Sequence, residues 1–123
     1  KKLLSRYKDS YLYAELAELV ADDTQKMALY CQAILHQPRE EFTTKYHYKL
    51  GVLLRKHNLA SRAAYEFNRC ADIRKRHGLP LTPFMQRLLG QFNGITPVSE
   101  SDQLALYQRS GAVVDALIKT QEK

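Results

Sequence analysis

The chain has 123 residues, of which 45% are hydrophobic and 26% are charged, and its formal net charge is +6. This length suits one domain with one hydrophobic core, which excludes a second catalytic module, and the composition is that of an ordinary globular protein. No apolar run reaches the roughly 18 residues of a membrane-spanning helix, and residues 1–20 lack a secretory signal pattern, so we expect a cytoplasmic protein.

The two cysteines, Cys31 and Cys70, are too few for a disulfide scaffold. Both lie in stretches with helical apolar periodicity, where a reduced and buried thiol is expected. The chain starts at Lys1 rather than at Met, so we expect a single domain over 1–123 that belongs to a larger protein.

Six helices are predicted, because helix caps recur along the chain while the alternation typical of strands is nearly absent. Residues 22–24 break the first helix and cap the second, which Pro38 ends. Glu40 and Glu41 suit the positive end of the third helix, so it is expected to begin there. The six helices are expected at about 3–20, 24–36, 40–58, 59–77, 83–92 and 100–121.

The second half of the chain has equally clear boundaries. Gly78 and Pro80 end the fourth helix, and Thr82 followed by Pro83 begins the fifth. Residues 99–102 resemble a capping box for the last helix. That helix carries an apolar seam of Leu104, Tyr107, Gly111, Val114 and Ile118. Short connections predict that neighbouring helices pair antiparallel.

One stretch, residues 47–71, has a distinctive pattern: a Leu-Gly pair, a Leu three residues on, a small residue after a turn, an aromatic residue, and another small residue. These residues are Leu50, Gly51, Leu54, Ala63, Phe67 and Cys70. The pattern resembles a tetratricopeptide repeat, in which small residues let two helices approach closely while large ones fill the space between them.

The resemblance implies an all-α fold in which antiparallel helix pairs stack as a short right-handed solenoid, with the last helix as a cap. The repeats would span about 7–38 and 44–78, with a divergent third pair over 82–121. The apolar seam of the last helix would then cover the fifth helix. Alternatively, it would dock on a second copy of the chain and cause self-association.

Catalytic signatures are missing, so we expect no enzyme activity and no cofactor. The five glycines are isolated and form no phosphate-binding loop. The four histidines lack metal-ligand spacing and are expected near helix ends or on exposed faces, so no metal site is predicted. They are His36, His47, His57 and His77.

The resemblance also implies a concave groove lined by the first helix of each pair, and hence a protein-binding scaffold. Cations and tyrosines in such a groove suit an acidic peptide or partner protein. A simply solvated basic face, with Tyr48 in the core, is the alternative. The groove positions are Lys8, Tyr11, Lys45, Tyr48, Lys49, Arg55, Lys56 and Arg87.

Charge is concentrated in residues 45–77, which hold nine basic and two acidic side chains. An alternative function is therefore a nucleic-acid-binding accessory domain driven by phosphate contacts. Cations at a helix C-terminus also offset the helix dipole, which gives this patch a purely structural explanation. The patch comprises Arg69, Arg74, Lys75 and Arg76.

Overall fold

The computed structural model describes residues 6–122, with side chains for residues 10–119. This part of the chain holds six α-helices, one short 3-10 helix and no strand, which confirms the predicted all-α class. The elements are α1 (Arg6–Leu19), α2 (Asp23–His36), η1 (Glu40–Phe42), α3 (Thr44–Lys56), α4 (Ala60–Arg76), α5 (Pro83–Gln91) and α6 (Glu100–Glu122).

Side-chain caps fix three of the helix starts, as the sequence predicted. Asp22, Thr82 and Ser99 each accept a hydrogen bond from the backbone N–H three residues further on, at 2.9, 3.1 and 3.1 Å. Two residues with positive φ reverse the chain: Asn58 (64°) follows α3, and Gly78 (70°) follows α4. Local chemistry therefore sets three of the helix starts and two of the helix ends.

The third helix begins later than predicted. Glu40 and Glu41 lie in η1, and α3 begins only at Thr44. The side-chain hydroxyl and the backbone N–H of Thr43 both donate to the carbonyl oxygen of Glu40, at 2.7 and 2.9 Å, and close a separate tight turn. The expected start at residue 40 is therefore wrong, and Glu40 is free to reach α4.

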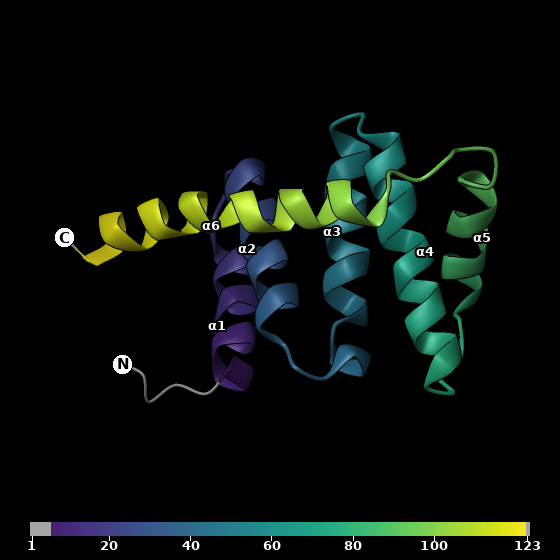
Figure 1. Cartoon of the computed structure of the whole chain (residues 1–123), viewed down its shortest axis with the longest axis horizontal. Coiled ribbons are helices and arrows are strands. Elements are labelled where there is room, and N and C mark those ends of the chain that lie inside the picture. The colour runs from purple at the N-terminus through teal and green to yellow at the C-terminus, as the bar shows by residue number, and fades with distance from the viewer. Residues whose placement is uncertain (1–5, 123) are drawn as a thin grey trace.

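The first five helices stand side by side, and α6 runs across the row from α4 past α2, away from α5 (Figure 1). α1 packs on α2, and α3 packs on α4; α2 joins the two pairs by packing on α3, while α5 packs on α4. α6 packs mainly on α2 and also reaches α4. The side of the molecule formed by α1 and α3 is therefore left uncovered by α6.

The expectation that α6 covers the fifth helix is wrong, because α6 packs on α2 instead. The physical reason is that polar residues belong to its buried face. Ser110 accepts a hydrogen bond from the side-chain amide of Gln32 on α2 at 2.9 Å, whereas Leu104 of the predicted seam is 42% exposed. The buried face of α6 comprises Gln103, Tyr107, Ser110, Val114 and Leu117.

The tightest helix contact lies between α3 and α4, where the repeat-like pattern placed it. A Cβ atom on Gly51 would lie 2.7 Å from Cε1 of Phe67, closer than atoms can approach. Phe67 is fully buried and packs edge-on against Phe92, with ring centroids 5.2 Å apart. Leu50, Leu54, Ala63, Phe67 and Cys70 are all buried, as predicted.

Both cysteines are buried and free, as predicted, so their thiols should resist modification. Burial raises the pKa of Cys31 and raises that of Cys70 to about 11, which leaves little thiolate at neutral pH. We expect the native protein to react with a thiol reagent such as Ellman's reagent roughly a hundredfold more slowly than the guanidinium-unfolded chain. Equal rates in the two states would contradict the packing described here.

Candidate functional site

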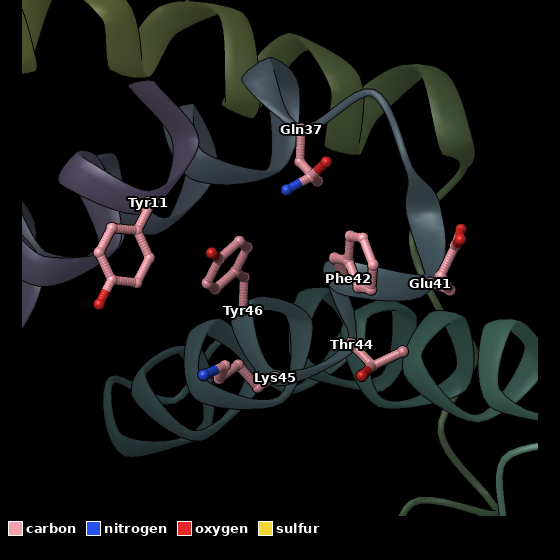
Figure 2. A pocket seen from close by; sticks show the side chains of 7 residues that line it. All are labelled: Tyr11, Gln37, Glu41, Phe42, Thr44, Lys45 and Tyr46. Carbon is pink, nitrogen blue, oxygen red and sulfur yellow. The ribbon is translucent and has the colours of Figure 1, made fainter. Parts of the chain in front are cut away.

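A pocket of about 540 Å³ opens between α1, η1 and the start of α3 (Figure 2). Its aromatic walls come from Tyr11, Phe42 and Tyr46, and Figure 2 shows Tyr46 between the other two. Phe42 and Tyr11 are exposed at the rim. The lining is completed by the polar side chains of Gln37, Glu41, Thr44 and Lys45.

Tyr46 gives the pocket a polar group that has no partner among the described residues. The side chain is only 5% exposed, yet its hydroxyl makes no hydrogen bond with the rest of the described chain. No fully buried side-chain oxygen or nitrogen lacks a partner in the described residues, so this hydroxyl must reach solvent. Because Tyr46 lines the pocket, its hydroxyl is available to a ligand there.

Lys45 supplies the positive charge of the site. It lies in the first turn of α3, is exposed, and has no ion pair with any described residue. A cation at a helix N-terminus is unfavourable by some tenths of a kcal/mol, so helix stability does not explain it. Lys45 lines the 540 Å³ pocket and also two neighbouring hollows of about 210 and 300 Å³.

In the 210 Å³ hollow, an acidic side chain already neutralises a predicted groove cation. Nζ of Lys49 lies 2.8 Å from a carboxylate oxygen of Glu18, which also accepts a hydrogen bond from the hydroxyl of Tyr30. These two hydrogen bonds lower the pKa of Glu18, while burial and the bond to Glu18 raise that of Tyr30. Lys49 is therefore less available to a ligand than Lys45.

Tyr48 belongs partly to the core and partly to the surface. It is half-buried, and its ring lies 6.2 Å from the rings of both Phe67 and Phe84, measured between centroids. It also lines the 300 Å³ hollow together with the exposed Phe84 of α5. An apolar surface thus continues from α3 towards α5.

The other predicted groove residues do not share this pocket. Arg55 reaches only the side-chain oxygen of Gln91, at 3.5 Å, and Lys56 is bound to Asp23 at 2.9 Å. Both lie in the last turn of α3, at the end opposite to Lys45. The guanidinium of Arg87 on α5 lies 5.8 Å from the ring centroid of Phe84, and the side chain of Lys8 lies outside the described residues.

Glu40 of η1 lies in the middle of the alternative, nucleic-acid patch. Its carboxylate pairs with Arg76 and, at 2.9 Å, with Nε2 of His77. The guanidinium of Arg69 lies 3.6 Å from the same carboxylate. His77 and Arg76 together lower the pKa of Glu40. Much of the patch is therefore neutralised within the molecule.

The remaining two cations of that patch differ from each other. Arg74 donates to the carbonyl oxygen of Pro80 through Nη2 and Nε, at 2.6 and 2.9 Å, and so holds the chain that follows α4. Lys75 is exposed and has no partner among the described residues. Arg74 thus has a structural role through its hydrogen bonds, whereas Lys75 contributes to α4 only through its charge in the last turn of the helix.

A buried polar network joins α3, α4 and α6, and the sequence analysis missed it. His47 was expected near a helix end or on an exposed face; it lies near the start of α3 but is buried, and its Nδ1 lies 2.6 Å from the fully buried carboxylate of Glu66. That carboxylate also accepts from Gln103 Nε2 at 2.6 Å and from the hydroxyl of Tyr107 at 2.5 Å. Burial and the negative charge of Glu66 raise the pKa of Tyr107, which keeps its hydroxyl a donor.

In the described part of the chain, no three His, Cys, Asp or Glu side chains lie close enough together to hold a metal ion. Among the described helices, none is both long and apolar enough to cross a membrane.

Comparison with known proteins places the chain in one family. No curated protein and no solved structure matches it. One family model matches residues 3–112, which covers α1 to α5 and the first half of α6. The chain therefore belongs to the family described as Domain of unknown function (DUF7017).

Proposed function

We propose that this domain is a non-enzymatic protein-interaction module of tetratricopeptide-like solenoid architecture, acting as a scaffold in the cytoplasm. Its ligand is an acidic peptide segment that lies along α1 and α3. The observation that carries the proposal is Lys45, which has no ion pair with any described residue and adjoins three hollows, the largest of them with aromatic walls.

The lining of the pocket defines the peptide more closely. An aspartate or glutamate side chain of the ligand pairs with Lys45, and a neighbouring apolar side chain enters the 540 Å³ pocket beside Tyr11 and Phe42. The hydroxyl of Tyr46 hydrogen-bonds the peptide backbone. Because Glu18 and Glu41 also adjoin these hollows, one acidic residue next to an apolar one fits better than a run of acidic residues.

Nucleic-acid binding has weaker support. Glu40 occupies the space among Arg69, Arg76 and His77, and a phosphate would have to displace it. Lys75 alone gives too little positive charge for phosphate-driven binding, which needs several cations along one surface.

The experiment is a fluorescence-polarisation screen of labelled peptides that pair one acidic with one aromatic residue, followed by titration of two charge-reversal variants. Lys45→Glu should weaken binding by about tenfold or more, because it puts repulsion in place of the ion pair. Lys75→Glu is the matched control, since Lys75 is also exposed and has no partner among the described residues, and it should change Kd less than about twofold.

Three outcomes would contradict the proposal. Equal losses in the two variants would indicate a non-specific charge effect, and no loss in either would exclude Lys45 as the contact. Binding of single-stranded nucleic acid, reduced only by Lys75→Glu, would support the alternative function.

A further inference from the structure

A second cavity lies where the end of α2, η1 and the start of α3 meet α4 and α6. Its volume is about 270 Å³, and it shares only Gln37 with the pocket of Figure 2. Helix α6 forms part of its wall through Glu100, Leu104 and Tyr107. The cavity is thus separate from the proposed peptide site and depends on the docking of α6.

The buried network fixes which nitrogen of His47 carries hydrogen. Arg62 donates to Oε1 of Gln103 at 2.9 Å, so the amide nitrogen of Gln103 must face Glu66. Gln103 and Tyr107 both donate to Oε2 of Glu66, while Nδ1 of His47 lies against Oε1, where an ionised carboxylate can only accept. Nδ1 of His47 is therefore the donor to Glu66, and in the neutral ring Nε2 presents a lone pair.

Nε2 of His47 has no partner in the part of the chain that the structure describes. His47 makes no hydrogen bond other than the one to Glu66, although the residue is only 3% exposed. Since no fully buried side-chain nitrogen of the described residues lacks a partner, Nε2 must reach solvent. His47 lines the 270 Å³ cavity, so its lone pair faces that cavity.

The other polar groups of the cavity also favour a ligand that donates hydrogen bonds and carries positive charge. The hydroxyl of Tyr65 and the carboxylate of Glu100 make no hydrogen bond or ion pair with any described residue. Arg69 is paired with Glu40. One cation and two carboxylates give the lining a net charge of −1, in a chain whose net charge is +6.

We propose that this cavity binds a primary alkylammonium group, the chemistry of a free alkylamine and of a lysine side chain. The ammonium group donates to Nε2 of His47 and to the hydroxyl of Tyr65, and Glu100 supplies the opposite charge at the mouth. The aliphatic stem lies against Ile34, Leu35, Pro38 and Leu104. The volume of about 270 Å³ accepts a four-carbon stem.

In the test, the full chain is titrated separately with butylammonium, 1-butanol and butyltrimethylammonium, and binding is monitored by two-dimensional NMR. Butylammonium should bind at least about tenfold more tightly than either analogue, because the alcohol lacks the charge and the trimethylated ion lacks an N–H donor. Its binding should also shift the 15N resonance of Nε2 of His47 while Nδ1 keeps its hydrogen. Equal affinity for the three compounds, or an unchanged Nε2 resonance, would overturn the proposal.

Variants that leave the buried network intact give an independent test. Tyr65→Phe and Glu100→Gln should each weaken butylammonium binding by about fivefold to tenfold. The control is Asp115→Asn, which makes the same charge change as Glu100→Gln at another exposed position of α6, outside the cavity. A loss of the same size in this control would show that only net charge matters and would refute the site.

A last titration identifies the source of the ammonium group. Nα-acetyl-lysine methylamide should bind like butylammonium if the cavity receives a lysine side chain of a partner protein. If it is excluded while butylammonium still binds, the cavity is a site for free amines. Failure of both compounds to bind would overturn the proposal, and none of these outcomes bears on the peptide pocket at Lys45.

Discussion

Replacing Gly51 by leucine should lower the free energy of unfolding by about 3 kcal/mol. Even the first atom of a side chain at this position would lie 2.7 Å from Cε1 of Phe67. The ring of Phe67 cannot move aside, because it is fully buried between Gly51, Tyr48 and Phe92. The loss is measured by urea denaturation, with the far-ultraviolet circular dichroism signal of the helices as the readout.

Gly90→Ala is the matched control for this change. Gly90 also lies within a helix, but nothing lies within 4 Å of a Cβ atom built there. Alanine is favoured over glycine in a helix, so this variant should be more stable by about 0.5–1 kcal/mol. If Gly51→Leu unfolded at the same urea concentration as the wild type, α3 and α4 could not pack through this contact.

Replacing Glu66 by alanine should cost about 4 kcal/mol, the largest single effect expected of a polar residue in this domain. The substitution leaves three buried donors, on His47, Gln103 and Tyr107, without their common acceptor. Because two of these donors belong to α6, the backbone amides of α6 should also lose protection in hydrogen exchange before those of α3.

Glu18→Ala tests whether this cost comes from burial rather than from the loss of a carboxylate. Glu18 also pairs with a cation, Lys49, but its side chain is 54% exposed. An exposed ion pair contributes at most about 1 kcal/mol, so this variant should remain near the stability of the wild type. Similar losses for Glu18→Ala and Glu66→Ala would refute a special role for the buried network.

Local sequence signals predicted the helices and the contact between α3 and α4. The caps at Asp22, Thr82 and Ser99 act within three residues, so their effect depends on no distant part of the chain. The close approach at Gly51 was predictable because only a residue without a side chain fits between two tightly paired helices, opposite Phe67.

The docking of α6 was not predictable from apolar periodicity alone. Gln103 and Ser110 face inward because partners on other helices satisfy their hydrogen bonds, and a hydrophobic pattern does not report such partners. A signal for His47 did exist: Leu50 and Leu54 follow it at the spacing of one helix face, and both are buried. A polar residue on an apolar face indicates a buried network.

The candidate peptide site was predictable only in part. Tyr11 and Lys45 were among the expected groove residues, and both line the pocket of Figure 2. Phe42 and Tyr46 were missed: Phe42 lies in η1, and the place of Tyr46 beside it depends on how the connection from α2 through η1 runs to α3. The path of such a connection is set by tertiary contacts, here including the ion pairs of Glu40 with α4.

The position of α6 has a consequence for how the domain unfolds. Stacked helix pairs that touch only their neighbours lose structure one pair at a time, starting from an end. Here Gln32 is hydrogen-bonded to Ser110, 78 positions further along the chain, and Glu66 is bonded to Tyr107, 41 positions further along. These distant bonds tie both helix pairs to the same crossing helix, so neither pair melts without loosening the other. The molecule should therefore open as one cooperative unit.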